Sequence, residues 1–175
     1  FGDALASVMS AAGFYVEKEF YVNDVGNQIA RLAVSVEKRI RECLGETIEL
    51  EEDDYRGVYL KEVAAGILEK HGRDILDKTE EERRAVFAEE TIVTMLEEQR
   101  RALECFNVRF DVWFRENQLH KEGALANALE ILRNKPENIY ENEGALWFAS
   151  TRYSDNEDRV LKKASGPTTY FMADI

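Results

Sequence analysis

The first 45 residues carry the periodicity of a helix, a strand and a second helix. Apolar residues recur at helical spacing over residues 3–12, and aromatic and β-branched residues crowd residues 15–22, which predicts a helix followed by a strand. A longer amphipathic stripe covers residues 29–43. Gly45 follows it where a left-handed residue would end a helix.

The middle of the chain combines an acidic stretch with strongly periodic helical segments. The carboxylates of residues 46–54 could hold Mg²⁺ or Ca²⁺, but no glycine-punctuated calcium loop is present, so a solvated loop or helix start is favoured. Helical spacing returns over residues 60–72. A long helix is predicted over residues 79–105, with Thr79 and Glu82 forming a capping box. Its predicted buried stripe consists of Val86, Val93, Leu96 and Leu103.

The last third of the chain changes period twice. Residues 108–114 alternate between apolar and polar side chains, which predicts a half-buried strand. A helix is predicted over residues 122–134, and a β-hairpin with strands at 139–140 and 145–149. An aromatic run then stops abruptly within residues 170–175, and the start is equally bare, so we expect a fragment trimmed inside structured regions.

Composition describes a globular chain without a membrane anchor. The sequence is 45% hydrophobic and 33% charged, and no apolar run approaches the roughly 20 residues of a membrane span. No targeting peptide is visible, so we expect a cytoplasmic protein. Cys43 and Cys105 lie far apart without CxxC spacing or clustered histidines, which predicts neither a disulfide nor a zinc site.

The net charge of −12 argues against a nucleic-acid partner, because phosphate contacts need lysine and arginine on the binding face. A sum over the whole chain does not describe a local patch, however. Lys162 and Lys163 could touch phosphate, although a solvated pair is favoured. His71 and His120 lie next to predicted helix ends, which favours capping or solvent-facing roles over catalysis.

Five sequence blocks, in order, resemble arginyl-tRNA synthetases. They are Tyr-Val-Asn-Asp-x-Gly-x-Gln-Ile at 21–29, Tyr-x-Gly-x-Tyr at 55–59, Phe-Asp-Val-Trp-Phe at 110–114, Gly-Ala-Leu-Trp at 144–147 and Asp-Arg-Val-Leu at 158–161. Each block is weak alone, but together they span nearly the whole chain, so chance agreement is improbable.

The resemblance implies an α/β fold, an incomplete Rossmann-like class I synthetase catalytic fold with a helical and antiparallel-β connective-peptide insertion. Residues 1–45 would form the first half of the catalytic fold, residues 46–160 the insertion, and residues 161–175 the re-entry into the catalytic fold. The intact enzyme would use ATP and Mg²⁺ to form arginyl-adenylate from arginine and then charge tRNA(Arg). The His-Ile-Gly-His motif of the class is absent, so we expect the fragment alone to be inactive, with no bound cofactor.

The resemblance also implies arginine-binding residues. Tyr170 and Asp174 match the family pattern Tyr-Phe-x-x-Asp-Ile, and in a helix they would face the same way. Asp174 could then accept paired hydrogen bonds from a guanidinium group, with Tyr170 offering its ring. The alternative is a core aromatic and a surface charge. Residues 164–169 depart from the family's usual Ser-Asp-Gly-Thr-Pro-Thr sequence, which leaves that loop's contacts open.

Asn23 and Asp24 follow the end of the first predicted strand, where Rossmann-type folds bind ligands. They could therefore border an active site, or they could cap the following helix. Two other functions remain open from the residues. One is a noncatalytic acidic module that binds a basic protein partner. The other is a metal-dependent hydrolase using Asp111, Glu116 or the acidic stretch, which is disfavoured because ligand histidines are lacking.

Overall fold

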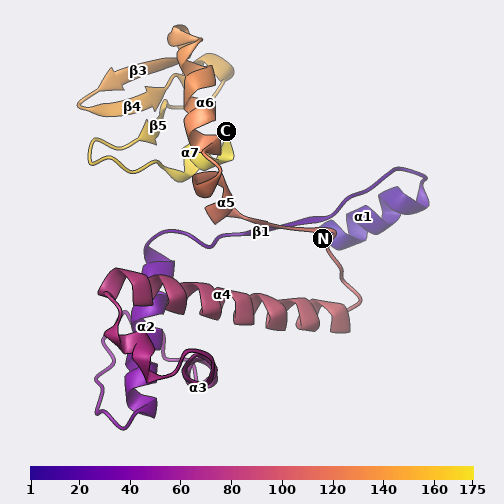
Figure 1. Cartoon of the computed structure of the whole chain (residues 1–175). Helices are drawn as coiled ribbons and strands as arrows, with labels where there is room; N and C mark the ends of the chain where they lie inside the picture. Colours follow the sequence, from indigo (N-terminus) through magenta and orange to yellow (C-terminus); the bar gives the residue numbers. More distant parts are fainter. The chain divides into compact units, whose positions relative to one another are not determined.

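The computed structural model describes all 175 residues and divides into two compact units. The N-terminal unit comprises Phe1–Trp113 and the C-terminal unit Phe114–Ile175. Figure 1 shows that the first is mainly helical, whereas the second contains an antiparallel sheet. The predicted α/β class is therefore confirmed at the level of a mixed fold. No helix combines the length and apolar content that a bilayer crossing requires.

The N-terminal unit is built from four α-helices, a short 3₁₀ helix and one strand. These are α1 (Gly2–Ala11), β1 (Glu19–Val22), α2 (Asn27–Cys43), α3 (Tyr59–His71), η1 (Arg73–Asp77) and α4 (Glu80–Cys105). The capping box of Thr79 and Glu82 is present and starts α4 as predicted. Gly45 follows α2 with φ = 92°, a conformation that glycine adopts without strain.

Three helices enclose the core of this unit. α2 contributes one apolar stripe, α3 a second, and Phe87 of α4 is completely buried between them. The core residues are Leu32, Ala33, Val36, Ile40, Leu60, Val63, Ala64, Ile67, Ile75 and Phe87. The helical periodicity of residues 29–43 and 60–72 therefore identified the core faces of α2 and α3.

The predicted buried stripe of α4 is correct only in part, since Val86 packs against the core and Leu96 and Leu103 are half-buried. The buried residues are Phe87, Thr91 and Ile92, whereas Val93 is 40% exposed. In Figure 1 the C-terminal half of α4 extends beyond α2 and α3. Only a short face near the start of α4 is therefore buried. The stripe of α1 also lacks a cover, because no residue of that helix is buried.

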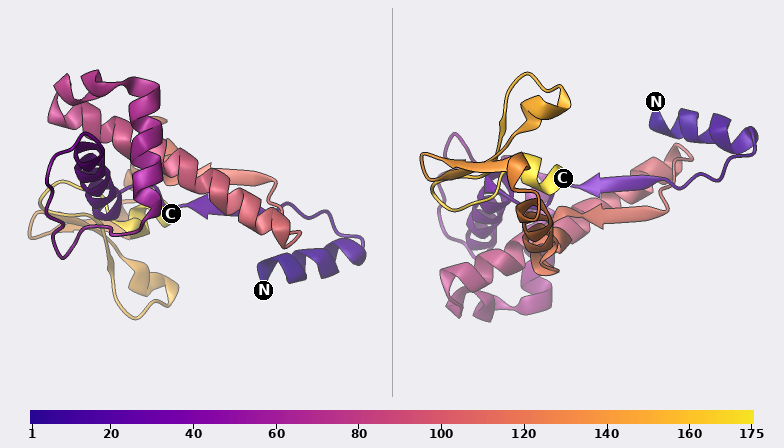
Figure 2. Two further views of the ribbon diagram at one scale, coloured as in Figure 1. Left: turned by 90° about the horizontal axis from the view of Figure 1, so that it is seen from below. Right: turned by 90° about the horizontal axis from the view of Figure 1, so that it is seen from above.

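β1 forms a two-stranded sheet with β2 (Val112–Arg115), and Figure 2 shows the two arrows running in the same direction. Both strands are shorter than predicted. The main-chain oxygen of Lys18 accepts hydrogen bonds from the amides of Asp111 and Val112, at 2.8 and 3.1 Å, and regular pairing follows from there. Residues 15–18 thus lie outside the strand, despite their β-forming composition.

The C-terminal unit joins two short helices to a three-stranded antiparallel sheet. Its elements are α5 (Glu116–Lys121), α6 (Ala124–Arg133), η2 (Pro136–Asn138), β3 (Ile139–Asn142), β4 (Ala145–Phe148), η3 (Ser150–Tyr153), β5 (Arg159–Lys162) and α7 (Tyr170–Asp174). The predicted hairpin is confirmed, with Glu143 and Gly144 both at positive φ in its turn. Neither α5 nor β5 was predicted from the sequence. α5 ends at Lys121, and Gly123, which is in a left-handed conformation, precedes α6.

Candidate functional site

The helix carrying Tyr170 and Asp174 is anchored to the sheet by main-chain hydrogen bonds. The chain turns back after β5, where the amide of Lys163 donates to the oxygen of Pro167 at 2.9 Å. The amide of Thr169 then donates to the oxygen of Leu161 at 3.0 Å, and α7 begins at the next residue. The position of Tyr170 therefore depends on the edge of the sheet rather than on a free loop.

α7 separates an inward face from an outward face. Met172 is 1% exposed, and the ring of Phe171 lies 5.9 Å from that of Phe148. Tyr170 is 63% exposed and Asp174 is also exposed. The helical spacing predicted for this pair is present, and the alternative of a core tyrosine is wrong. An exposed ring and a carboxylate one turn apart can together contact a planar cation.

A second candidate region lies in the N-terminal unit, at the end of β1. A pocket of about 690 Å³ is bounded there by the end of β1, the first turns of α2, and α4. Asn23 and Asp24 both line it, Asn23 with an exposed side chain and Asp24 with 4% exposure. The N-cap residue of α2 is Gly26, so neither Asn23 nor Asp24 occupies that position.

Two of the five family blocks meet in this pocket. Tyr55 and Tyr59 of the second block line it together with Asn23 and Gln28 of the first. Burial raises the pKa of Tyr59 above its usual value. A lining of aromatic and aliphatic side chains with a few polar groups is the usual composition of a small-molecule site.

The acidic stretch places Tyr55 against this pocket. The Tyr55 amide donates to Ser35 Oγ at 3.0 Å, and Asp54 accepts from Lys38 Nζ and from the Glu51 amide, each at 2.7 Å. Burial acts to raise the pKa of Asp54, but these hydrogen bonds outweigh it and the pKa is lowered. The stretch is a surface loop, as predicted, but the Asp54 side chain is only 7% exposed and anchors it.

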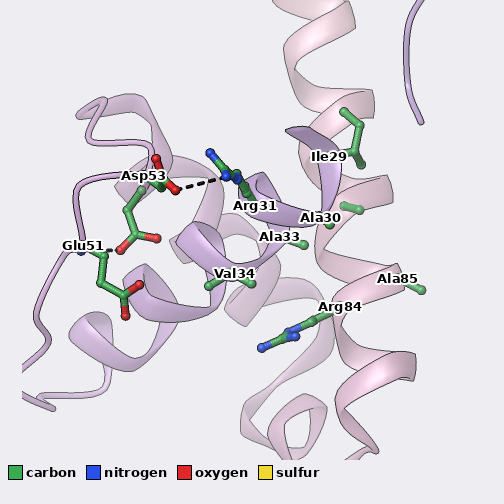
Figure 3. A pocket seen from close by; sticks show the side chains of 11 residues that line it. Ile29, Ala30, Arg31, Ala33, Val34, Glu51, Asp53, Arg84 and Ala85 are labelled. Carbon is green, nitrogen blue, oxygen red and sulfur yellow. Dashed lines mark hydrogen bonds and ion pairs between the residues drawn. The ribbon is translucent and has the colours of Figure 1, made fainter. Parts of the chain in front are cut away.

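A further pocket of about 450 Å³ lies between α2, the acidic stretch and α4. Figure 3 shows Arg31 paired with Asp53 on one side and Arg84 on the other. The Arg31–Asp53 distance is 3.1 Å, and Arg84 Nε lies 3.6 Å from Glu37. Because these charges pair within the protein, the pocket offers little free charge to a ligand. No three His, Cys, Asp or Glu side chains are grouped to hold a metal ion.

The aromatic block at 110–114 contacts β1 and the residue before it. Phe110 and Trp113 lie 5.2 and 4.6 Å from Phe20, measured between ring centroids, and Arg100 lies 4.7 Å from the centroid of the Trp113 ring. Asp111 Oδ2 accepts from the Lys18 amide at 2.8 Å. The block therefore holds β1 beside the chain that enters β2.

The remaining candidates behave as ordinary surface or helix-end residues. His71 closes α3 with its Nε2 atom 2.9 Å from Glu90, and His120 is exposed near the end of α5. Lys162 and Lys163 are exposed. The internal contacts of Asp54 were not predicted from the sequence, because only its acidic neighbours suggested a role.

Comparison with known proteins covers the whole chain. The family model described as tRNA synthetases class I (R), catalytic domain, matches residues 1–175. Arginine–tRNA ligases from Bacillus subtilis and from a Geobacter species are 44% and 45% identical over 174 residues, covering 99% of this chain. The chain spans 31% of the length of each of these relatives.

Solved structures agree. A crystal structure described as an arginyl-tRNA synthetase from Campylobacter jejuni matches with a TM-score of 0.84 at 33% identity, covering 99% of this chain and 37% of that one. The arginyl-tRNA synthetase of Plasmodium falciparum matches in fold alone, with a TM-score of 0.61 at 14% identity over 99% of this chain and 29% of that one. The chain thus belongs to the catalytic-domain family of the class I arginyl-tRNA synthetases.

Proposed function

We propose that the protein containing this chain activates arginine with ATP to arginyl-adenylate and transfers the arginyl group to tRNA(Arg). The observation that carries the proposal is the family match over residues 1–175. The exposed pair of Tyr170 and Asp174 on α7 supports it further. We place this reaction in the cytoplasm, where charged tRNA is consumed.

The proposed roles of the pair follow from their chemistry. The ionised Asp174 accepts two parallel hydrogen bonds from the guanidinium group of arginine, which a lysine ammonium group cannot donate in the same geometry. Tyr170 offers its ring face to the same delocalised cation. Asn23 and Asp24, at the end of β1, are proposed to border the active site.

The division of the chain is part of the same proposal. Residues 1–45 belong to the first half of a Rossmann-like catalytic fold, residues 46–160 to the connective-peptide insertion, and residues 161–175 to the re-entry into the catalytic fold. The anchoring of α7 to β5 supports a re-entry point close to Lys162. Residues 1–175 alone are expected not to charge tRNA, since they correspond to 31% of the length of the relatives.

ATP and Mg²⁺ are the remaining reactants of the proposal. The described residues bring no cluster of three metal-ligating side chains together. In the proposed reaction the phosphates of ATP carry the ion, because Mg²⁺ usually takes only one or two protein carboxylates.

The noncatalytic acidic module is not favoured by any contact. Carboxylates of the acidic stretch form ion pairs within the protein: Asp54 lies 2.7 Å from Lys38, and Asp53 lies 3.1 Å from Arg31. A basic partner would have to compete with these pairs.

Substitution of Asp174 by alanine in the full-length protein tests the proposal. We expect the KM for arginine to rise on the order of 100-fold, because a charged hydrogen-bonded pair is lost, while the KM for ATP stays within about threefold. The matched control is Glu130→Ala, which removes an exposed carboxylate from α6. Equal increases for both substrates would contradict the role of Asp174. An unmodified protein that activates another amino acid would overturn the function itself.

A further inference from the structure

A basic pocket lies in the C-terminal unit, beside the β3–β4 hairpin. It has a volume of about 430 Å³ and is lined by Arg133 from the end of α6, Tyr140 from β3, and Lys162 and Lys163 from β5 and the residue after it. Glu141 is the one acidic residue in its lining. Three cations therefore gather around one hollow of a protein whose net charge is −12.

The cations of this pocket are unpaired. The side chains of Arg133, Lys162 and Lys163 are exposed, and none forms an ion pair or hydrogen bond with another residue. Arg159, on the same strand as Lys162, behaves differently. It lies 2.8 Å from Asp155 and 2.9 Å from Glu157. The unpaired state is thus a property of the pocket rather than of the strand.

The main chain beneath the two lysines is firmly held. Lys162 pairs with Leu146 of β4 and forms a bridge to Thr168. The amide of Lys163 donates to Pro167 at 2.9 Å. The positions of the ammonium groups are therefore restricted to the reach of their side chains, and Glu141, the acidic residue of the lining, forms no ion pair with either lysine.

Tyr140 lines the same pocket, and two contacts restrain its side chain. Its hydroxyl donates to Asp158 at 2.8 Å, which raises the pKa of the Tyr140 phenol, and its ring stacks on Trp147 with centroids 6.3 Å apart. The aromatic side chain therefore keeps its place when an anion approaches.

We propose that this pocket binds phosphodiester groups of an RNA, with Arg133, Lys162 and Lys163 as the phosphate contacts. The partner rests on the proposed function, which supplies tRNA as a substrate. Exposed, flexible cations from separate elements are typical of contacts that position a nucleic-acid backbone. A free phosphate ion would instead favour buried donors or a helix N-terminus, whereas the helix end that reaches this pocket is the C-terminus of α6.

The test measures binding of tRNA to the full-length protein as a function of salt. In the variant Lys162→Ala/Lys163→Ala, we expect roughly tenfold weaker binding near 0.15 M salt. The slope of log K against log[salt] should fall by about 0.7 to 0.9 for each lost contact. Arg133→Ala should show the effect of one contact. Lys162→Arg/Lys163→Arg keeps the charge and should restore binding, and the circular dichroism spectrum checks that each variant is folded.

The matched control is Lys78→Ala/Lys121→Ala, which removes the same charge from exposed lysines outside this pocket. An equal loss of affinity in this control would show a general charge effect and overturn the site. An unchanged salt slope in the Lys162 and Lys163 variant would also overturn it. So would weaker inhibition by inorganic pyrophosphate combined with normal tRNA affinity, because the pocket would then serve a small phosphate.

Arginine-dependent charging by the unmodified protein separates this proposal from the proposed function. If charging occurs and the salt slope is unaffected by the lysines, only the RNA pocket is wrong. If the protein does not charge tRNA with arginine but tRNA binding still depends on the lysines, the proposed pocket is supported and the proposed function is wrong.

Discussion

In the N-terminal unit, charged side chains are tied to one another across the helices, whereas in the C-terminal unit a group of cations is left free. Glu37 of α2 is 7% exposed and accepts from Arg41 at 3.1 Å and from Arg83 of α4 at 3.0 Å. Lys162 and Lys163 have no such partner. Charge in the first unit stabilises packing, and charge around the hairpin is available to a ligand.

The two units also differ in how they bury apolar side chains. The N-terminal unit has one cluster in which Phe87, Ile40 and Leu60 are completely buried. The C-terminal unit buries fewer large residues, chiefly Leu161 and Met172, and adds ring contacts such as that between Phe148 and Tyr153 at 5.7 Å. We therefore expect a substitution in the helical core to have a larger effect than a lost ion pair at the sheet.

The largest effect on stability is expected from Phe87→Ala. Removal of a completely buried ring leaves a cavity between α2, α3 and α4, which should lower the free energy of unfolding of the N-terminal unit by about 3–5 kcal/mol. The control is Phe106→Ala, since Phe106 is 82% exposed at the end of α4. Amide hydrogen exchange in α2 measures the difference. Equal protection in the two variants would contradict the assigned core.

A smaller effect is expected from Asp54→Asn. The substitution weakens the charged hydrogen bond from Lys38 and should destabilise the loop by about 1–3 kcal/mol. Asp53→Asn serves as the control, because the Asp53 side chain is 68% exposed and its pair with Arg31 should contribute less than about 1 kcal/mol. Hydrogen exchange of the Tyr55 amide, which donates to Ser35, measures the loop directly. If Asp53→Asn increased the exchange rate of the Tyr55 amide as much as Asp54→Asn does, the role of Asp54 as the anchor of the loop would be contradicted.

The smallest effect concerns pH and lies in the C-terminal unit. The hydrogen bonds from Arg159 lower the pKa of Asp155 from 3.8 to about 2. A lowered pKa means that the stabilisation is complete above pH 3.8 and is lost as the pH falls through about 2. Titration of the Asp155 carboxyl carbon by NMR checks the value. In Arg159→Gln the pKa should return toward 3.8, and a titration unaffected by this change would contradict the pairing.

Local rules were sufficient where a short segment contains its own signal. Thr79 and Glu82 start α4 by hydrogen bonds within four residues, and Gly144 lies at positive φ in the hairpin turn. The five family blocks likewise required only their order. The helical spacing of Tyr170 and Asp174 was also predictable. Their exposure was not, because it depends on how α7 is anchored to β5.

Tertiary contacts decided the features that depend on residues distant in the chain. The buried face of α4 follows from α2 and α3, which pack around Phe87, whereas Val93 of the same helix is 40% exposed. Asp54 is an anchor because Lys38 lies on a helix beside it.

The sequence by itself determined the order of most elements, the helix start at Thr79, the hairpin and the family, because each depends on neighbouring residues or on motif order. Only the tertiary structure decided which charges are paired and which are free. Arg133 and Lys162 lie far apart in the sequence and line one pocket because the sheet packs beside the end of α6. Pairing and burial are set by distances in space, and sequence spacing does not specify those distances.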